Sequence, residues 1–496
     1  MTDEKKKLRI ITLAGIFAVW IIFNGILLMR HELWRDEANV WLIARSLNPL
    51  QLFVEIKYQG HPCLWYLLVM PFAKMGLPFG TIGMISLLIM AVSAGLFLWK
   101  APVHIVTKIV CLFSPIFTYF YSVIARNYCL IALLFILLAW CYPKRNEKPV
   151  LYGLLLGLLV QADTIALAGA GLISAMWLWE GFSTFIRTKS KTLIMKILRG
   201  IWIPLASLLL WMAEFRQVSD SPHYQMRDMG LTELLQEIKN YSYTILMRMT
   251  GQEKFFCTIA FLVLLVLGLV ISIRVKNFWP LLVMSGSFLL QSLFSVLVYQ
   301  LHIWHFISLC FVFIWMLWVW YLQNEAEKPG KLNRIVMYLA EFWLVVLAVC
   351  MFLNWNSESE ASSLDNALRG SYSDGVNAAA YIETEISNEE VLIVTDVPCG
   401  STVMAYLKDY EFYYAGTGQK VYYADYSEEQ EQGISVEALY VWAKDAFPDR
   451  EAVYLLDSRD SCLSGTEKLQ DFEVMYQTEE DTARGEEYTL YRVPIR

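Results

Sequence analysis

The stretch MRHELWRDEANVW, residues 29–41, decides the fold, because it ends the first apolar segment of the chain with a cluster of charged side chains. The preceding segment, Leu8 to Leu28, has the length of a transmembrane helix and exceeds the apolar part of a signal peptide. No small-residue cleavage site follows it. The sequence therefore predicts that this segment stays in the membrane and that the charged cluster lies at the edge of the bilayer.

The composition of the whole chain is typical of a polytopic membrane protein. Of its 496 residues, 57% are hydrophobic, 15% aromatic and 18% charged, and the mean hydropathy is +0.43. A soluble protein of this length does not need so much apolar surface. Acidic residues outnumber basic ones almost threefold from residue 355 onward, whereas basic residues predominate before it. This change predicts a transmembrane domain over residues 1–354 and an extracytoplasmic soluble domain over residues 355–496.

Apolar runs of transmembrane length recur through the first domain and predict about eleven helices. The predicted spans are 8–29, 80–99, 105–122, 127–142, 149–164, 165–182, 198–214, 255–273, 278–299, 303–322 and 335–354. One further apolar run, residues 61–78, is ambiguous, because it is shorter and contains Pro71 and Lys74. In the loop 215–254, Pro222, His223 and the helical spacing of Leu231–Met249 indicate a surface helix.

The Lys and Arg clusters decide how run 61–78 is interpreted. If it lies flat in the membrane interface, all six clusters fall on one side; if it spans, every cluster after the first changes side. Because short loops rich in Lys and Arg stay in the cytoplasm, we predict an interfacial helix, a cytoplasmic N terminus and a plasma-membrane location. The clusters are Lys5-Lys6-Lys7, Lys100/Lys108, Lys144-Arg145/Lys148, Arg187/Lys189/Lys191, Arg274/Lys276 and Lys328/Lys331.

The acidic tail has the alternating pattern of a small α/β domain. The predicted strands are 391–396, 451–458 and 487–493, and the predicted helices are 375–386 and 435–447. No phosphate-binding loop, nucleophile elbow or metal motif occurs in its sequence. Cys399 and Cys462 are candidates for a disulfide, whereas most of the nine cysteines suit apolar spans.

The charged cluster after the first span is consistent with catalysis. ATP and nucleotide sugars stay in the cytosol, but an enzyme on the outer face can use an activated donor carried by a lipid. Asp36 and Glu37 are candidate catalytic residues, because a partly desolvated carboxylate can take the proton of an acceptor hydroxyl that attacks an anomeric carbon. Arg35 favours the ionised carboxylate and is a candidate substrate-binding residue. The acidic pair is equally consistent with a helix start, where it interacts favourably with the helix dipole.

The leaving group of such a reaction is a phosphate, and cations stabilise the charge that develops on it. Lys57 and His61 in KYQGHPCLWY (residues 57–66) and Arg126 in SVIARNYCL (residues 122–130) are candidate ligands of the donor phosphate. Arginine suits bidentate contact with phosphate. Arg126 is also consistent with a helix anchor that reaches phospholipid head groups.

Further polar groups fall at the predicted outer ends of spans and are candidate substrate-binding residues: Tyr128, Gln161, Asp163, His302 and His305. Asp163 is equally consistent with a helix cap. His302 and His305 can share a helix face, but the sequence offers no third ligand beside them, so we expect no metal. The predicted topology brings these groups to one membrane face, where ionisable residues indicate function.

The sequence also resembles a known superfamily. The stretches WRDEANVWLIAR (residues 34–45), Gly60-His61-Pro62 at the start of an apolar helix, and YSVIARNYCL (residues 121–130) together resemble the GT-C polyprenyl-phosphate-sugar glycosyltransferases over most of residues 8–322. This superfamily includes the protein O-mannosyltransferases and the aminoarabinose transferases of lipid A. The resemblance extends to an uncharacterised bacterial branch typed as mannosyltransferase-like.

The resemblance implies a GT-C-like domain whose first outer loop contains two interfacial helices. It gives Asp36, beside Glu37, the role of base or site organiser, relates Gly60-His61-Pro62 to the lipid phosphate, and matches Arg126 to the arginine of the second outer loop. Cys63 stands where many members have proline or alanine. Some relatives carry an additional aspartate in the second outer loop that is missing here, and Asp163 is the candidate to replace it.

We therefore expect an inverting glycosyltransferase that moves a hexose or pentose from an undecaprenyl-phosphate carrier to a glycan, lipid or protein acceptor on the outer face. No metal, other cofactor or nucleic acid is expected to take part. One alternative is a transporter or flippase of a lipid-linked glycan, which would be expected to show inverted repeats and ionisable residues at mid-membrane. The other is a non-catalytic cell-envelope scaffold that acts through the acidic tail.

Overall fold

The computed structural model describes residues 3–215, 227–326, 331–356 and 363–496, and these fall into two compact units. The helical unit comprises Met1–Ile26, Ser86–Ala213 and His223–Glu358. The loop–tail unit comprises Leu27–Ile85, Glu214–Pro222 and Ser359–Arg496. The first predicted outer loop therefore belongs to the same unit as the acidic tail, a grouping that the composition does not indicate.

Eight helices in the described part of the chain are long and apolar enough to cross a membrane. They are α1 (Asp3–Arg30), α5 (Thr81–Lys100), α9 (Leu167–Thr188), α10 (Thr192–Glu214), α12 (Lys254–Arg274), α13 (Trp279–Leu297), α14 (Ile303–Ala326) and α15 (Lys331–Asn354). Many large apolar side chains on them are exposed, as expected for helices that contact lipid. The chain is a multi-pass membrane protein.

The other three predicted spans contain helices that are too short to count among these eight. They are α6 (Ile105–Leu112), α7 (Tyr128–Cys141) and α8 (Pro149–Ala162). Every predicted span thus contains a helix, but the prediction of one continuous helix over residues 105–122 is wrong. The helix ends at Leu112 because Pro115 has no N–H and disfavours helical geometry at Ser114. Tyr119 then takes a left-handed conformation, with φ of 68°.

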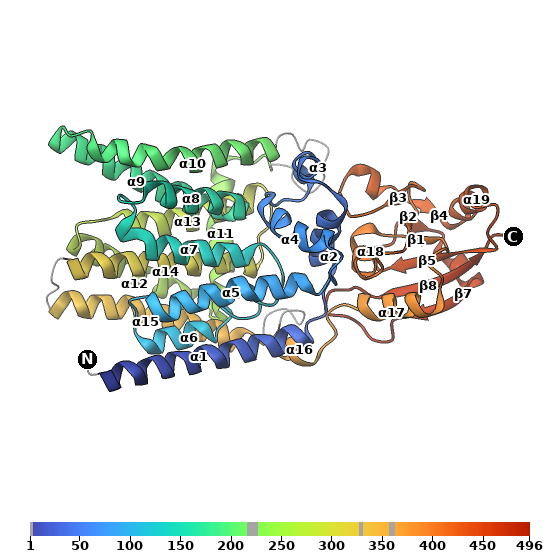
Figure 1. The fold of residues 1–496 in the computed structure, drawn as a ribbon, viewed down its shortest axis with the longest axis horizontal. Helices are drawn as coiled ribbons and strands as arrows, with labels where there is room; N and C mark the ends of the chain where they lie inside the picture. The colour runs from blue at the N-terminus through green and yellow to red at the C-terminus, as the bar shows by residue number, and fades with distance from the viewer. Residues whose placement is uncertain (1–2, 216–226, 327–330, 357–362) are drawn as a thin grey trace. The chain divides into compact units, whose positions relative to one another are not determined.

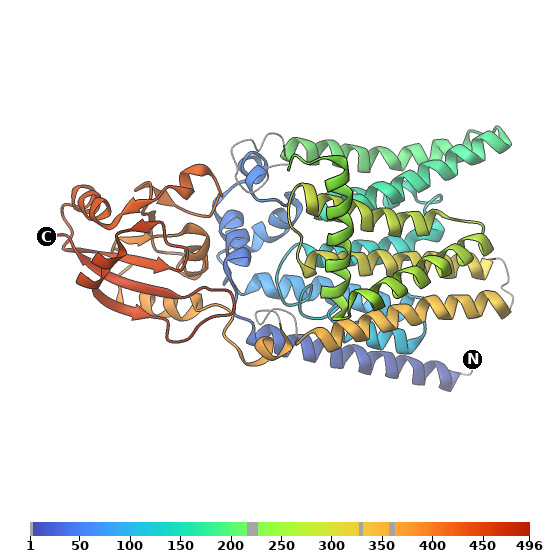
Figure 2. The same cartoon turned by 180° about the vertical axis from the view of Figure 1, so that it is seen from behind.

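The predicted surface helix within residues 231–249 is confirmed as α11 (Leu231–Thr250), whereas Pro222 and His223 lie outside the described residues. Figure 2 shows α11 crossing the neighbouring helices of the helical unit at a steep angle. In the same unit, the N terminus lies at the end where α9 turns into α10 (Figure 1). Three basic clusters therefore share that end of the unit. They are Lys100/Lys108 at the end of α5 and in α6, Lys144-Arg145/Lys148 before α8, and Arg187/Lys189/Lys191 at the α9–α10 turn.

Glycines allow α8 and α10 to pack backbone to backbone. A Cβ atom added to Gly153 would lie 2.1 Å from the carbonyl oxygen of Gly200, and one added to Gly200 would lie 2.2 Å from the carbonyl oxygen of Pro149. Contacts this short are possible only for residues without a side chain. These two glycines therefore fix how closely the helices approach.

The loop part of the loop–tail unit is formed by four short helical segments. They are α2 (Arg35–Ser46), α3 (Pro49–Glu55), the 3-10 turn η1 (Ile56–Tyr58) and α4 (Leu64–Lys74). At 11 residues, α4 is too short to cross a membrane, which agrees with the prediction that run 61–78 does not span. Helix α2 packs against α4 and also against α18 (Val397–Tyr406) of the tail.

The tail contains a six-stranded mixed sheet with the order β3-β2-β1-β5-β8-β7. Its strands are β1 (Leu392–Val394), β2 (Phe412–Tyr414), β3 (Lys420–Val421), β5 (Ala452–Ser458), β7 (Glu473–Gln477) and β8 (Tyr488–Pro494). Strand β1 pairs in parallel with β2 and β5, and the other pairs are antiparallel. A separate two-stranded parallel sheet joins β4 (Ile434–Ser435) to β6 (Leu463–Ser464).

Helices cover both faces of the larger sheet. Apolar residues of α19 (Val436–Ala446) pack with Ile393, Val453 and Leu455 on one face. Gly400 of α18 lies against Val394, which points to the opposite face because side chains alternate along a strand. Helix α17 (Gly375–Glu385) packs against α18, and α16 (Leu364–Arg369) precedes it.

The tail confirms the prediction of an α/β domain. All five predicted elements occur, at β1, β5, β8, α17 and α19, but the sequence pattern missed α16, α18 and strands β2, β3, β4, β6 and β7. Cys399 and Cys462 are both free, so the candidate disulfide between them is not formed.

Candidate functional site

Helix α2 begins at the charged cluster and gives its two carboxylates different surroundings. The Glu37 side chain is completely buried. Its Oε2 atom accepts a hydrogen bond from the backbone N–H of Trp34 (3.2 Å) and lies 3.0 Å from Nε2 of His31. The interaction with Trp34 satisfies a donor at the helix N-terminus, so Glu37 fixes the start of α2. Asp36, in the same first turn, is only partly buried.

Arg35, the first residue of α2, is held by the tail. Its backbone N–H donates to Oε1 of Glu486 (2.9 Å), and its Nη1 atom donates to Oδ2 of Asp460 (3.3 Å) and to Sγ of Cys399 (2.9 Å). Burial raises the pKa of the Cys399 thiol, which is therefore protonated at neutral pH. The tail thus positions the residue that directly precedes Asp36.

Glu486 is a fully buried carboxylate at the centre of this contact. It accepts hydrogen bonds from Ser373 Oγ (2.6 Å) and Thr402 Oγ1 (3.0 Å) in addition to the Arg35 backbone. Burial raises the pKa of Glu486 to about 7, and these hydrogen bonds oppose the rise by stabilising the charged form. The protonation of Glu486 therefore changes near neutral pH.

A second polar contact joins the middle of α2 to the tail. The Asn39 amide donates to Ala424 O (2.9 Å) and to Gln59 Oε1 (2.9 Å), and its oxygen accepts from Ala424 N–H (2.8 Å). Gln59 donates to the same Ala424 carbonyl (2.9 Å). Buried polar groups need such partners, so this three-residue network specifies how α2 docks on the tail.

The Gly60-His61-Pro62 motif lies just before α4, where the chain bends. Gly60 has φ of 70°, a conformation that glycine adopts without steric cost, which explains why a glycine opens the motif. His61 is partly buried. The ammonium of Lys57 lies over the ring of Tyr58, 4.4 Å from its centroid. The loop–tail unit therefore contains Arg35, Asp36, Glu37, Lys57 and His61 of the predicted site.

In the helical unit, the turn before α7 is fixed by Asp163. The Asn127 amide donates to Asp163 Oδ2 (2.7 Å) and to the carbonyl of Ala162 (2.7 Å). Asp163 Oδ1 accepts from the backbone N–H of Ile165 (2.9 Å) and so caps the 3-10 turn η3 (Thr164–Ala166). Asp163 is thus a helix cap, which is one of the two roles that the sequence predicted for it. Its hydrogen bond from Asn127 also connects the α8–α9 loop to the residue beside Arg126.

The second predicted pair in this unit is Tyr128 and His305. The Tyr128 hydroxyl lies 3.1 Å from His305 Nε2, and His305 Nδ1 accepts from the backbone N–H of His302 (2.9 Å). A neutral His305 therefore carries its proton on Nε2 and donates it to the tyrosine oxygen. The ring of Tyr121 stacks on Tyr128, with centroids 5.5 Å apart, and its hydroxyl donates to the Trp304 carbonyl (3.1 Å).

The other predicted residues of the helical unit are Arg126 and Gln161. Both side chains are largely buried. Gln161 donates to the carbonyl of Ser207 in α10 (3.0 Å), which is a contact between helices. Arg126 lies in the turn that Asn127 and Asp163 fix. The structure thus brings together Asp163 with the Arg126 turn, and Tyr128 with the His302–His305 pair.

Sequence reasoning missed the groups that hold these residues in place. Asn127 stands next to Arg126, and its position in a predicted outer turn is a signal that could have found it. Asn39 and Gln59 are ordinary polar residues in a polar loop, and Glu486 is one of many carboxylates in an acidic tail. Nothing local in the sequence distinguishes these three residues.

Comparison with known proteins agrees with the fold derived above. The chain is a polytopic α-helical membrane protein with an ArnT-like fold and a C-terminal soluble α/β domain. Among solved structures, it is similar to the apo form of ArnT, the aminoarabinose transferase, from Cupriavidus metallidurans. The two share 13% sequence identity with a TM-score of 0.54, over 97% of each chain.

A structure of the same transferase bound to undecaprenyl phosphate is also similar, with 13% identity and a TM-score of 0.49 over 97% of each chain. No protein-family model matches the sequence, and no curated protein matches it. At this level of identity, the likeness to ArnT establishes the fold, and function has to be argued from the residues.

Proposed function

We propose that this protein is an inverting glycosyltransferase that moves a sugar from a polyprenyl-phosphate carrier to an acceptor on the outer face of the membrane. The observation that carries this proposal is the likeness to apo ArnT over 97% of both chains, which spans the membrane helices, the first loop and the tail. A polyprenyl phosphate is the carrier that the GT-C resemblance of the sequence implies. A hexose or a pentose is the transferred group.

Asp36 is the base in this proposal. Of the two adjacent carboxylates, Glu37 is completely buried and engaged with Trp34 and His31, whereas Asp36 is partly exposed. The acceptor oxygen attacks the anomeric carbon, and the bond from that carbon to the phosphate oxygen breaks. The bonding electrons leave with the polyprenyl phosphate, and Asp36 takes the acceptor proton. Glu37 acts as a positioning residue that fixes the helix turn on which Asp36 stands.

Arg126, Lys57 and His61 hold the donor phosphate in this proposal. Phosphate charge increases as the glycosidic bond breaks, so cations held in fixed positions favour the transition state. The hydrogen bonds from Asn127 to Asp163 and Ala162 support such a role for Arg126, because they make its turn rigid. Substrate contacts are assigned to Arg35, Tyr128, Gln161, His302 and His305. Asp163 has a positioning role.

The basic clusters support the proposed direction of transfer. The cluster at the start of α1 shares one end of the helical unit with those at the α9–α10 turn (Figure 1). Short loops rich in Lys and Arg favour the cytoplasm, so this end is assigned to the cytoplasmic side. Arg126 precedes α7, and His305 lies in the first turn of α14. The other ends of both helices point to the basic end of the unit, so we assign Arg126 and His305 to the outer side.

Ligand-dependent unfolding tests the proposal. The full-length protein in detergent is heated with a panel of polyprenyl-phosphate sugars, because a ligand of the folded state raises the unfolding temperature. One donor should stabilise the wild type, and Arg126→Ala should weaken its apparent affinity by about tenfold or more. Arg187→Ala, at an exposed position of α9, is the matched control and should behave as wild type. Arg126→Lys serves as a milder variant if Arg126→Ala does not fold.

Two results would overturn the proposal. One is the absence of stabilisation by any donor in a wild-type protein that unfolds cooperatively. The other is equal stabilisation by polyprenyl phosphates and by zwitterionic lipids, because this would reflect a general effect of lipid.

A further inference from the structure

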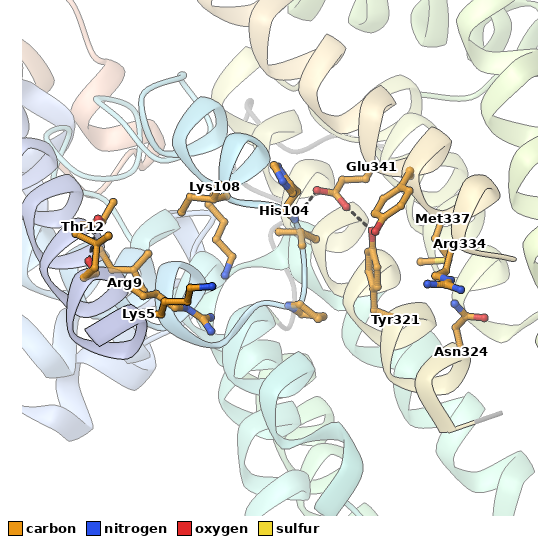
Figure 3. A pocket seen from close by; sticks show the side chains of 16 residues that line it. Lys5, Arg9, Thr12, His104, Lys108, Tyr321, Asn324, Arg334, Met337 and Glu341 are labelled. Atoms are coloured by element: carbon orange, nitrogen blue, oxygen red, sulfur yellow. Dashed lines mark hydrogen bonds between the residues drawn. The ribbon is translucent and has the colours of Figure 1, made fainter. Parts of the chain in front are cut away.

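A cavity of about 810 Å³ lies in the helical unit at the end where the chain begins (Figure 3). Its walls come from the first turns of α1, the connection between α5 and α6, the last turn of α14 and the first turns of α15. It shares no residue with the site proposed above. The cavity is much larger than a single phosphate ion.

Cations dominate the lining of this cavity. Figure 3 shows Lys5 and Arg9 on α1 near Lys108 on α6, and Arg334 on α15 on the opposite side of the cavity. The charges of Arg9 and Lys108 are close enough to repel each other. Holding like charges together costs free energy unless an anion compensates them. The lining is thus suited to an anionic group.

Among the described residues of the lining, Glu341 is the one carboxylate, and it is already engaged. Glu341 Oε1 accepts from the backbone N–H of His104 (2.6 Å) and from Thr107 Oγ1 (2.5 Å), and Oε2 accepts from the Tyr321 hydroxyl. These bonds connect α15 to α6 and α14. Among the residues that the structure describes, no carboxylate forms an ion pair with Lys5, Arg9 or Arg334. Glu341 offsets part of the charge of Lys108, whereas Lys5, Arg9 and Arg334 are exposed and can bind an anion from the surroundings.

Apolar side chains of the lining are exposed on the outer surface of the helical unit. Leu8 is 65% exposed and Tyr338 is 58% exposed, and both stand on helices of transmembrane length. A ligand that places an anionic group on the cations can thus lay an apolar chain against these residues. Basic pockets between membrane helices on the cytoplasmic side are typical binding sites for acidic lipid head groups.

We infer that this cavity binds the phosphate head group of an anionic phospholipid. Lys5 and Arg9 contact the phosphate, Arg334 adds positive charge on the opposite side of the cavity, and Leu8 and Tyr338 contact the acyl chains. Lipid binding would join the N-terminal helix α1 to α15 at the end of the unit that carries the basic clusters. The site is separate from donor binding, so it stands whether or not the transferase proposal holds.

Titration of phospholipid into the full-length protein in neutral detergent tests this inference. Native mass spectrometry would measure bound phosphatidylglycerol and phosphatidylcholine for the wild type and for the double variant Arg9→Gln/Arg334→Gln. We expect phosphatidylglycerol to bind the wild type about tenfold more tightly than phosphatidylcholine, and the double variant to lose this preference. Lys6→Gln, on α1 but outside the lining, should keep it. Arg9→Gln alone replaces the double variant if the latter does not fold.

A second set of experiments distinguishes a lipid phosphate from a soluble phosphate. Inorganic phosphate and glycerol 3-phosphate are added in place of lipid, and the unfolding temperature is followed. Stabilisation by phosphatidylglycerol but not by these soluble anions supports the inference. Equal stabilisation by soluble phosphate would overturn the assignment to lipid, and an unchanged lipid preference in the double variant would overturn the site.

Discussion

The backbone N–H of Arg35 donates a hydrogen bond of 2.9 Å to the carboxylate of Glu486, although 451 positions separate the two residues. Arg35 opens α2, and Asp36, the proposed base, is the next residue. The soluble tail thus holds the helix turn that carries the central chemical group of the proposed function. We infer that the tail stabilises the first loop in the conformation that the reaction needs.

The pH dependence of stability should report on Glu486. Its pKa is about 7 in the folded protein, against 4.5 for an ordinary glutamate. Below pH 4.5 Glu486 is protonated in both the folded and the unfolded protein, so its contribution to stability is fully present. As the pH rises toward 7, the unfolded chain loses its proton first, so the folded state is destabilised, by on the order of 3 kcal/mol above pH 7. Thermal unfolding between pH 5 and 8 should therefore show stability falling with pH.

Glu486→Gln is the variant that isolates this effect, because its side chain stays neutral. It should remove part of the decline and be more stable than wild type at pH 8. Glu473→Gln, which changes an exposed carboxylate of β7, should keep the wild-type slope. A wild type and a Glu486→Gln variant with the same slope would contradict the raised pKa.

Docking of α2 on the tail should depend on Asn39. Asn39→Leu leaves the buried Ala424 N–H without its acceptor, which costs about 1–3 kcal/mol per unsatisfied group. Hydrogen exchange measured by mass spectrometry should then be faster by about tenfold or more in peptides that contain Ala424. Asn377→Leu, at an exposed position of α17, serves as the control and should leave exchange there unchanged. Unchanged protection of Ala424 in Asn39→Leu would show that the network is not needed for docking.

Asp163 should act through structure and not through proton transfer. Asp163→Asn keeps an oxygen for the Ile165 N–H but presents an NH₂ group to the Asn127 amide, so it loses one charge-assisted hydrogen bond. We expect a loss of about 1–3 kcal/mol in stability and a weaker donor affinity, because the turn of Arg126 loosens. A transfer rate reduced to the background level in a variant of normal stability and normal donor affinity would instead make Asp163 a catalytic carboxylate.

Close packing of α8 and α10 should be sensitive to a single methyl group. Gly200→Ala places a Cβ atom 2.2 Å from the Pro149 carbonyl, and overpacking of this kind costs about 1–3 kcal/mol. The unfolding temperature should therefore fall. Gly171→Ala in α9 is the matched control, because its Cβ would meet nothing within 4 Å. Equal unfolding temperatures for the two variants would mean that α8 and α10 can separate at little cost.

The sequence predicted the helices well, because apolar runs of transmembrane length report directly on membrane insertion. It failed over residues 105–122, where hydropathy continues but Pro115 ends the helix at Leu112 and Tyr119 takes a left-handed conformation further on. In the tail, α18 begins with the residues Val-Pro-Cys-Gly, whose proline and glycine are typical of a turn. The short strands β2 and β3 owe their conformation to pairing within the sheet rather than to their own pattern.

Most candidate site residues could be named from the sequence, but their partners could not. Hydrogen bonds between Tyr128 and His305, or between Arg35 and Glu486, join positions that no local pattern relates. The same limit concealed the difference between Asp36 and Glu37. Adjacent carboxylates look equivalent in a sequence, and only the surrounding fold buries one and leaves the other partly exposed.

The central claim is that Asp36 serves as the base of a lipid-dependent sugar transfer. The most direct test incubates purified wild type, Asp36→Asn and Lys6→Gln with a radiolabelled polyprenyl-phosphate sugar and membrane extract as the source of acceptor. It then follows label leaving the lipid. We expect transfer by the wild type and Lys6→Gln, and a rate lower by about a hundredfold or more in a stably folded Asp36→Asn that still binds the donor. Full transfer by Asp36→Asn would contradict the claim.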